Sequence, residues 1–280
     1  MLENTFCHIP RVTIRSERLI WEAGLRSWSA ITEPAEWPLR RIPLDTISRH
    51  IEESYLRLRA DDPHYFSAAL PATLHWRLLP EFRHHIAFLD IETTGLTPGR
   101  NAITTIAVYD GHDVRTYVQG QNLERFAREI RDYKLLVTYN GKCFDVPFIE
   151  RSMGLTLDQV HIDLRYVLRS LGYKGGLKGC ERQMGIRRPG LEDVDGYFAV
   201  LLWQEYRRHK NEKALETLLC YNIHDVVNLE TLLVKAYNLK IKESPFERSH
   251  RIEPPIFPEI RYAADEDVIG RLKYQMTGDE

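Results

Sequence analysis

The feature that most constrains this chain is a short apolar run that carries two acids. Residues 86–92, Ile-Ala-Phe-Leu-Asp-Ile-Glu, have the length and composition of a buried strand. Successive side chains of a strand point to opposite faces, so Asp90 and Glu92 project from the same face. Charges in such a strand are costly unless they are paired or bound to metal. The run therefore predicts a buried strand whose end presents two carboxylates, the ligands that a hard divalent cation prefers.

A second buried strand is predicted over residues 135–139, followed by a Gly-containing turn and an acid. Asp145 stands where the sequence of residues 145–153 indicates the start of a helix. Two interpretations of Asp145 stay open: an N-cap of that helix, or a carboxylate that the strand end delivers beside Asp90. The Asp-x-Glu spacing in the first strand adds little by itself, because 40 acids in 280 residues would produce it about once by chance.

Residues 197–244 contain neither Gly nor Pro. This stretch predicts two helices broken near residues 209–211, because a single helix of that length would be unusual in a globular domain. Within the second helix, Tyr221 and Asp225 are four positions apart and share one face. A phenol and a carboxylate could therefore serve a single centre, although this spacing is weakly specific.

The remaining pattern indicates an α/β fold. Residues 102–109 and 114–118 flank an Asp-Gly pair and predict a hairpin, and residues 123–133 fit an amphipathic helix. Strands joined by crossover helices predict a mixed β-sheet flanked by helices. Ahead of the first buried strand, the sequence predicts helices over residues 14–23, 27–31 and 44–60, then an extended connector with Pro63, Pro71 and Pro80.

Composition excludes several classes without choosing a function. The formal net charge is -2, from 38 Lys+Arg and 40 Asp+Glu, which argues against a histone-like binder but permits a local basic surface. The four cysteines form no Cys-x-x-Cys pair, so neither a zinc knuckle nor a disulfide framework is indicated. The longest apolar run, residues 197–203, is far shorter than the ~20 residues that span a bilayer. The first residues lack the pattern of a secretion signal. We therefore expect a cytoplasmic protein without a membrane partner.

Three blocks of the sequence together resemble the DEDD 3′ to 5′ exonuclease superfamily, which has a ribonuclease H-like fold. Residues 90–95, Asp-Ile-Glu-Thr-Thr-Gly, match its first motif, residues 140–145 match its second and residues 221–225 its third. The tyrosine subclass is indicated, because the histidine subclass has His five residues before the last Asp, where this chain has Cys220.

The wider chain is similar to the YprB-like ribonuclease H-like domain family. Residues 75–83 lead directly into the first motif, and the segments 177–181 and 185–188 lie between the second and third motifs. We expect four parts: a helix-hairpin-helix-like segment, a helical arm with a connector, the ribonuclease H-like exonuclease domain and a C-terminal tail, over residues 1–35, 36–83, 84–240 and 241–280.

The resemblance implies two-metal hydrolysis of a phosphodiester bond at a 3′ end. Asp90, Glu92 and Asp225 would hold the ion that activates water, and Asp90 with Asp145 the ion that steadies the leaving oxygen. Tyr221 would orient the attacking water or help to deprotonate it. Four carboxylates in one cleft cannot all ionise cheaply without about two divalent cations. Mg²⁺ or Mn²⁺ is expected, because no His or Cys forms a soft-ligand cluster nearby.

The resemblance also implies residues that would bind the nucleic-acid strand. They are Thr93, Thr94, Gly95, Asn140, Phe144 and Lys178. Lys178 belongs to residues 165–188, which contain seven Lys or Arg and a single acid, Glu181. This basic segment could track a phosphate backbone or form an ordinary solvated helix surface. His161 and His224 fit a structural role better than a role at the rim of the site, and Asp163 either supports the site or caps a helix.

The first part of the chain carries a weaker signal. Residues 9–24 resemble one helix-hairpin-helix unit, a module that presents backbone amides to phosphates. Arg11 and Thr13 stand where that unit has glycines, which disfavours close approach of the backbone. The alternative is a packing role for Leu19, Trp21 and Trp28.

The sequence therefore predicts a metal-dependent 3′ to 5′ exonuclease that acts on single-stranded DNA or RNA ends. The main alternative is a catalytically weak nucleic-acid-binding or adaptor protein that keeps the nuclease fold, and a third is internal cleavage of structured nucleic acid. The presence of all four acids together with Tyr221 favours the enzyme. No residue in the sequence identifies a group that reads the 2′-hydroxyl, so DNA and RNA remain equal candidates.

Overall fold

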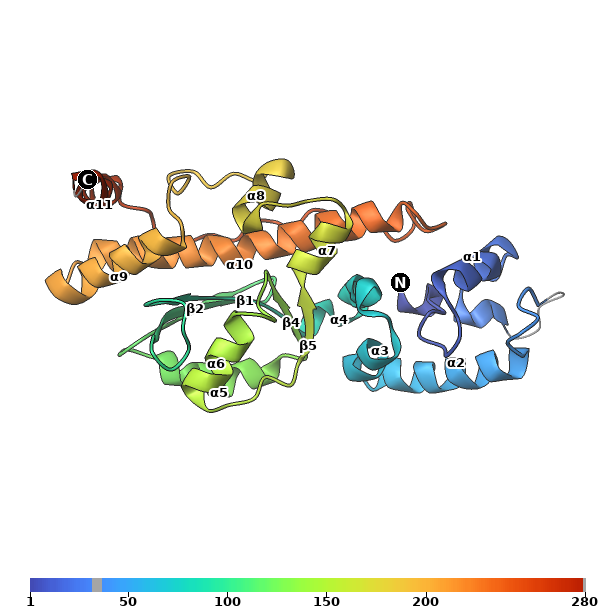
Figure 1. The fold of residues 1–280 in the computed structure, drawn as a ribbon. Coiled ribbons are helices and arrows are strands. Elements are labelled where there is room, and N and C mark those ends of the chain that lie inside the picture. Colours follow the sequence, from blue (N-terminus) through green and yellow to red (C-terminus); the bar gives the residue numbers. More distant parts are fainter. Residues whose placement is uncertain (32–36, 279–280) are drawn as a thin grey trace. The chain divides into compact units, whose positions relative to one another are not determined.

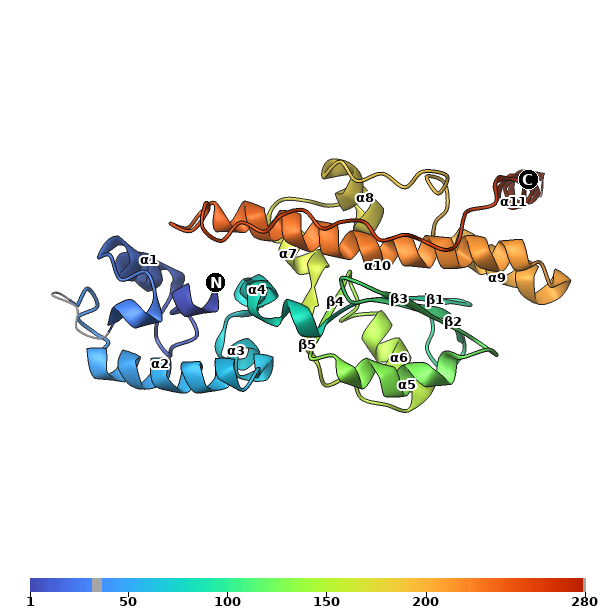
Figure 2. The same ribbon diagram turned by 180° about the vertical axis from the view of Figure 1, so that it is seen from behind.

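The computed structural model describes residues 1–31 and 37–278 and divides into two compact units. The first unit comprises Met1–His85 and Val234–Glu253, and the second comprises Ile86–Leu233 and the residues from Pro254 onward. Figures 1 and 2 show the chain from opposite sides. The helix α10 contributes residues to both units.

A five-stranded mixed sheet forms the second unit, with the strand order β3-β2-β1-β4-β5. The strands are β1 Ile86–Thr93, β2 Ile103–Tyr109, β3 Val114–Val118, β4 Leu135–Thr138 and β5 Val160–Asp163. β1 pairs antiparallel with β2 and parallel with β4, and β5 extends the parallel side. The expected α/β fold is confirmed, and so is the hairpin of β2 and β3.

Helices cover both faces of this sheet, with α5 and α6 on one face and α10 across the other (Figure 1). The helices of this unit are α5 Phe126–Glu129, α6 Asp145–Met153, α7 Leu164–Ser170, α8 Gly176–Gln183, α9 Gly196–His209, α10 Glu212–Ile241 and α11 Glu266–Gly278, with short 3-10 turns at Leu123–Arg125 and Ile130–Asp132. Leu89 and Ile91 of β1 pack with Phe126 and Phe148 under α5 and α6. Because side chains alternate along a strand, the acids of β1 lie on the face that α10 crosses.

The predicted break between two long helices is confirmed: α9 ends at His209, and Lys210 takes a left-handed conformation with φ +54°. The tail from residue 254 to 258 has no regular secondary structure, and the Phe257 ring lies 5.5 Å from the His224 ring of α10. The helix α11 follows, and the sequence pattern did not predict it. Its residues Val268 and Leu272 are buried in the core that α9 and α10 form.

The first unit is helical. Its elements are η1 Leu2–Asn4, α1 Ile14–Glu22, η2 Trp28–Ile31, α2 Leu44–Arg59, α3 Pro63–Ala69, η3 Ala72–Leu78, α4 Leu79–Phe82 and η4 Arg83–His85. An aromatic core holds them, in which the Phe66 ring lies 6.2 Å from Trp28 and 6.1 Å from Phe82. Glu17 is fully buried; it accepts hydrogen bonds from the backbone of Phe6 and Cys7 and pairs with Arg77 at 2.9 Å.

Two secondary-structure predictions are wrong. The connector with three prolines is not extended but folds into α3, η3 and α4, because each proline stands at or near a helix start, where a missing backbone N–H costs nothing. The helix expected over residues 123–133 is only the short α5 between two 3-10 turns.

The helix-hairpin-helix-like segment shows why its glycine positions matter. Arg11 stands at φ +72°, a left-handed conformation that favours glycine. Trp21 and Trp28 are buried and donate hydrogen bonds to the backbone oxygens of Asn4 and Thr5, so the packing role expected for them is confirmed. Leu19 is 45% exposed, so the packing role expected for it is wrong.

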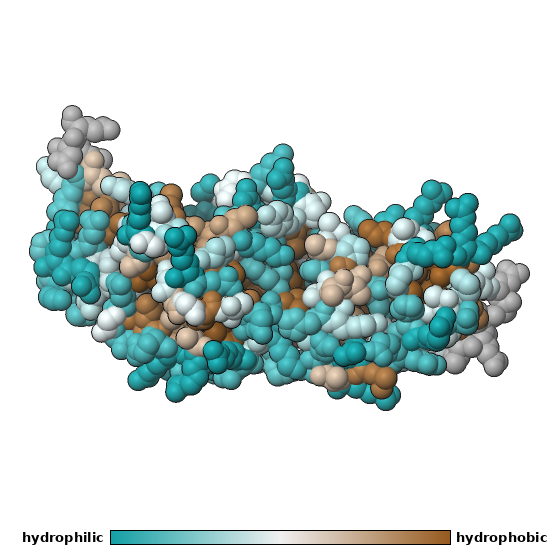
Figure 3. Space-filling view, turned by 60° about the horizontal axis from the view of Figure 1, so that its bottom comes forward, coloured by the Kyte–Doolittle hydropathy of each residue, from teal (hydrophilic) through white to brown (hydrophobic). Residues whose placement is uncertain are grey.

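No helix in the described part of the chain has both the length and the apolar character that a membrane crossing requires. On the face drawn in Figure 3, hydrophilic side chains cover most of the surface. The predicted boundary between residues 35 and 36 falls outside the described residues, and the four-part division of the chain stays a prediction.

Candidate active site

Carboxylates from β1 and α10 meet on one face of the sheet. Oxygen atoms of Asp90, Glu92 and Asp225 all lie within 4.8 Å of one another. The pairing of β1 shifts register between Glu92 and Thr93, so the regular strand ends just where these acids stand. Asn222, one helical turn before Asp225, donates from Nδ2 to Asp90 Oδ2 at 2.7 Å and accepts from Thr105 at 3.0 Å. This amide fixes the Asp90 carboxylate relative to α10.

Asp145 reaches the same region from the first turn of α6. The residue that precedes the helix is Phe144, and Asp145 does not cap it. Instead, Asp145 Oδ1 accepts a hydrogen bond of 3.2 Å from the backbone N–H of Ile91, between the two acids of β1. Of the two interpretations left open by the sequence, the geometry therefore favours delivery beside Asp90 over the N-cap.

The loop between β4 and α6 is held by Asp163. This side chain accepts hydrogen bonds from the backbone N–H groups of Asn140, Lys142 and Arg165, at 2.8, 3.1 and 3.0 Å. It therefore caps α7 and also supports the loop that positions Asp145. Gly141 is required in this loop, because a Cβ there would lie 2.3 Å from the Thr138 hydroxyl oxygen.

Burial of so many acids perturbs their ionisation. Burial, with the negative charges of Asp225 and Asp145, raises the pKa of Asp90 well above its usual range. The pKa of Glu92 rises well above its usual range for the same reasons, and burial raises the pKa of Asp145 to about 7. Burial also raises the pKa of Asp225, although the Arg188 guanidinium opposes that shift. Such a cluster is the environment that divalent cations stabilise, since they offset the repulsion between carboxylates.

Arg188 is an internal countercharge of this cluster. Its Nε and one Nη donate to the two oxygens of Glu181 at 2.7 and 2.5 Å, and its other Nη pairs with Asp225 Oδ1. Asn228 donates to the same Glu181 at 2.9 Å. All four side chains are buried. The sequence placed Arg188 in a basic segment with a surface role, and the signal that could have revealed its role is the lone acid Glu181 among seven cations.

A second cation lies beside Tyr221. The ammonium of Lys178 is buried, lies 4.7 Å from the centre of the Tyr221 ring, and has no hydrogen-bond partner among the described residues. Burial lowers the pKa of Lys178. Burial, together with the charges of Asp225 and Glu92, raises the pKa of the Tyr221 phenol, which therefore stays protonated. Tyr221 is thus a hydrogen-bond donor toward this site.

The four carboxylates, Lys178 and Tyr221 line one pocket of about 740 Å³. The five predicted catalytic residues and the six predicted strand-binding residues all belong to its lining. The remaining lining residues, which the sequence did not assign to the site, are Ile91, Leu96, Tyr139, Gly175, Gly176, Leu177, Asp195, Gly196, Tyr197 and Val200. Leu96 and Tyr197 are 82% and 62% exposed, so the pocket opens between apolar side chains that reach solvent.

The two histidines weighed at the sequence level do not line this pocket. His161 bonds to the Thr138 hydroxyl at 2.8 Å, and the His224 ring lies 5.5 Å from the Phe257 ring in a tilted arrangement. Burial lowers the pKa of each imidazole to about 4. The bond to Thr138 supports the structural role expected for His161, whereas the buried Nδ1 of His224 has no hydrogen-bond partner among the described residues, so its structural role stays a prediction.

The comparison with protein families agrees with this fold. A family model described as the RNase H superfamily matches residues 87–237, from β1 to near the end of α10. The chain belongs to the RNase H superfamily, which is a nuclease superfamily.

Individual relatives cover only part of this chain. It is 29% identical over 190 residues to the uncharacterized protein YprB of Bacillus subtilis (strain 168), a match that covers 60% of this chain and 46% of YprB. The chain therefore spans less than half the length of that relative. Among solved structures, the family B DNA polymerase from the hyperthermophilic archaeon Pyrobaculum calidifontis aligns with 56% of this chain and 24% of the polymerase, at 16% identity and a TM-score of 0.41.

Proposed function

We propose that this protein is a metal-dependent 3′ to 5′ exonuclease of the DEDD superfamily, tyrosine subclass. It hydrolyses the ends of single-stranded DNA or RNA, and the predicted exonuclease domain, residues 84–240, carries this activity. The observation that carries the proposal is the convergence of Asp90, Glu92, Asp145 and Asp225 on one pocket. The pocket also holds Tyr221 and Lys178, whose ammonium has no hydrogen-bond partner in the described part of the chain. Oxygen ligands from β1, α6 and α10, all but Asp90 buried, repel one another and fit hard divalent cations.

Two groups of carboxylates would hold the ions, Mg²⁺ or Mn²⁺. Asp90, Glu92 and Asp225 would hold one, and Asp90 with Asp145 the other. Two cations bound in such a site supply activation of a water and stabilisation of the leaving oxygen. The oxygens of Asp90, Glu92 and Asp225 already lie within 4.8 Å of one another, which supports the first group.

Other side chains of the pocket would orient the water and bind the strand. The protonated phenol of Tyr221 would orient the attacking water by donating a hydrogen bond. Lys178 would hold a phosphate of the strand, because its ammonium is desolvated and unpaired. Phe144 and Tyr197 line the pocket and offer aromatic faces on which bases can stack, a mode of binding that tolerates any sequence.

The backbone around the acids suits a single strand as well. Gly175 and Gly176 stand at the start of α8 with φ +99° and +73°, and both line the pocket with Thr93, Thr94 and Gly95. Glycines allow a phosphate to approach the backbone N–H groups at a helix start. A nucleotide end would therefore meet donors from α8 on one side and carboxylates on the other.

One observation favours the alternative of a catalytically weak, nucleic-acid-binding protein. Arg188 pairs with Asp225 and so competes with a cation for that carboxylate. In this alternative, Lys178 and the aromatic side chains bind a strand, while the arginine takes the place of the metal.

Release of mononucleotides distinguishes the two. End-labelled DNA and RNA strands are incubated with Mn²⁺ and with the wild type, Asp145→Asn, Asp225→Asn or the exposed-site control Asp158→Asn. We expect both site variants to lose activity by about a hundredfold or more, because each removes a carboxylate that would hold a metal ion against the reacting phosphate, and the control to match the wild type. A wild type as inert as Asp225→Asn, with strand binding intact in both, would support the alternative.

Metal binding has its own readout. Millimolar Mg²⁺ should raise the melting temperature of the wild type by mass action and that of Asp225→Asn by less. An equal shift in the two proteins would show that the ion binds elsewhere.

A further inference from the structure

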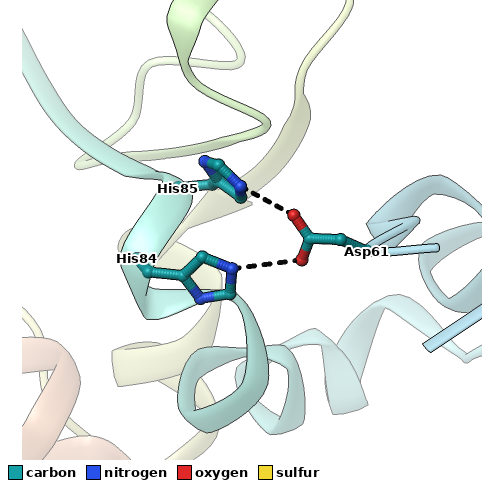
Figure 4. Close-up of side chains that lie close together, drawn as sticks. All are labelled: Asp61, His84 and His85. Atoms are coloured by element: carbon teal, nitrogen blue, oxygen red, sulfur yellow. Dashed lines mark ion pairs between the residues drawn. The ribbon is translucent and has the colours of Figure 1, made fainter. Parts of the chain in front are cut away.

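A second cluster of metal-ligating side chains lies in the first unit, apart from the acids of the pocket. Asp61, His84 and His85 each offer one ligand atom, and these atoms lie within 4.8 Å of one another. Figure 4 shows both imidazole rings turned toward the Asp61 carboxylate. The Nε2 atoms of His84 and His85 lie 3.2 and 2.7 Å from the two Asp61 oxygens.

The backbone holds these three side chains together from two different elements. Asp61 lies in the turn between α2 and α3 with φ +54°, a left-handed conformation that Asp tolerates better than most residues. Its backbone N–H bonds to the Leu58 carbonyl at 3.1 Å, which fixes the turn. His84 and His85 end the 3-10 turn η4, and their ring centres are 4.4 Å apart. The carboxylate and the two imidazoles are thus presented by well-defined backbone.

We propose that Asp61, His84 and His85 form a binding site for a transition-metal ion of the Zn²⁺ type. Two imidazole nitrogens and one carboxylate oxygen are the donor set of zinc sites that leave a coordination position to water. Mg²⁺, which takes oxygen ligands, is disfavoured by the same donors. The site therefore differs in chemistry from the all-carboxylate cluster of the second unit.

The distances fit such an ion after a small adjustment. Two ligand atoms on a tetrahedral Zn²⁺, with bonds of about 2.0–2.1 Å, lie about 3.3 Å apart. The 3.2 Å contact of His84 already has this length, and the 2.7 Å contact of His85 has to open by about 0.6 Å. The widest separation in the cluster has to close by at most about 1.5 Å. The side chains of His84, His85 and Asp61 are 59%, 33% and 27% exposed, so the rings can rotate and an ion can enter from solvent.

The three ligands come from separate parts of the sequence, so a bound ion would link those parts. His85 is followed directly by Ile86, the first residue of β1, and Asp61 joins α2 to α3. An ion bound here would tie two segments of the first unit, separated by more than twenty residues of sequence, immediately before the strand that carries Asp90 and Glu92. Binding should therefore stabilise the first unit, because the ligands are brought together only when it is folded.

The test is two titrations of the full chain. Zn²⁺ binding is measured by calorimetry, and Co²⁺ binding is measured by the visible absorption of the bound ion. Both titrations are done in millimolar Mg²⁺, which occupies the carboxylate cluster. Asp61→Asn keeps an acceptor and tolerates the left-handed turn, and His85→Gln removes one nitrogen. His112→Gln, at an exposed hairpin turn, is the control.

We expect one equivalent of Zn²⁺ to bind the wild type and the control, with a Co²⁺ absorption band, and the affinity to fall by more than about tenfold in Asp61→Asn and in His85→Gln. The same titration on Glu92→Gln should give the wild-type result, which separates this site from the proposed nuclease site. Absence of binding to the wild type would overturn the proposal. So would equal binding by wild type and both site variants, provided that circular dichroism shows all of them folded.

Discussion

Single buried charges carry most of the candidate site. Lys178 is the clearest case, because its ammonium is buried without a hydrogen-bond partner among the described residues, and burial lowers its pKa. An unpaired cation in such a place is costly unless it meets an anion during function. Lys174, a few residues earlier in the same basic segment, is exposed and has no such setting.

Replacing Lys178 by Met should therefore weaken binding of a single strand by about tenfold, the value of one hydrogen bond to a charged group. The slope of log affinity against log salt concentration should become shallower by about 0.7, because one phosphate contact is lost. Fluorescence anisotropy with a labelled strand, without divalent metal, measures both. A loss of the same size in Lys174→Met would contradict a specific role for Lys178.

The ion pairs of Arg188 are expected to stabilise the folded protein. Substitution by Met leaves Asp225 and Glu181 buried without their cation, which should lower the free energy of unfolding by about 3–5 kcal/mol. Mg²⁺ should restore more stability to this variant than to the wild type, because the ion then supplies the missing positive charge. Urea denaturation with and without Mg²⁺ measures both effects. Arg187→Met, at an exposed position, should change stability by less than about 0.5 kcal/mol, and an Arg188→Met variant as stable as this control would refute the argument.

At the residue scale, the sequence predicted the acids but not their partners. Asp90 and Glu92 were visible because charges interrupt an apolar strand. Asn222 was not, although it stands three positions before Asp225 on a helix and is fully buried. The role of a polar side chain inside a helix depends on which strand crosses beneath it, and that is decided by tertiary packing.

At the scale of the elements, the loop between β4 and α6 tolerates substitution least. A Cβ at Gly141 would lie 2.3 Å from the hydroxyl oxygen and 2.6 Å from the Cβ of Thr138, a buried residue at the end of β4. Gly141→Ala should therefore cost about 1–3 kcal/mol through overpacking and reduce nuclease activity, because the same loop leads into Asp145. Urea denaturation and the mononucleotide assay test these two effects.

Gly270→Ala is the matched control for this substitution. Gly270 lies inside α11 with no atom near its added Cβ, so the change should stabilise the helix by up to about 1 kcal/mol. If Gly141→Ala behaved like Gly270→Ala, the loop would have room that the structure does not show.

The helices of the first unit have a pH-dependent stability. Burial lowers the pKa of His8 to about 3, and His8 bonds to the Ser54 hydroxyl at 2.8 Å. Its pKa in the unfolded chain is near 6.5. Between these values the unfolded state binds more protons, so this histidine makes stability fall as the pH falls from 6.5 toward 3, by about 1.4 kcal/mol per pH unit. His8→Gln should flatten that dependence in denaturation measured at several pH values, whereas the exposed control His112→Gln should leave it unchanged. A wild-type slope retained in His8→Gln would rule out this source.

Elements were predictable where the pattern was long or strongly periodic. The strand β1, the hairpin and the break between α9 and α10 follow from the sequence. β5 does not, because a run of four residues is too short to show a pattern, and only pairing with β4 makes it a strand. The segment with three prolines was predicted to be extended, whereas each proline stands at or near the start of a helix. Short elements are decided by what packs on them.

At the scale of the whole molecule, the net charge of -2 conceals charges that are sorted by place. Acids gather on one face of the sheet. Two cations of the basic segment, Lys178 and Arg188, turn inward beside them, and its other five cations are exposed. The overall charge was therefore a poor guide to function. Membership of the RNase H superfamily fixes the fold, while the direction of cleavage is a separate claim.

The most direct measurement of that claim uses a single strand labelled at its 5′ end, with its 3′ end either free or chemically blocked, incubated in Mn²⁺ with the wild type or Asp225→Asn. The account predicts a ladder of products that shortens stepwise from the free 3′ end, a strand that stays intact when that end is blocked, and no ladder with Asp225→Asn. Equal cleavage of free and blocked strands, or a ladder that persists in Asp225→Asn, would contradict it.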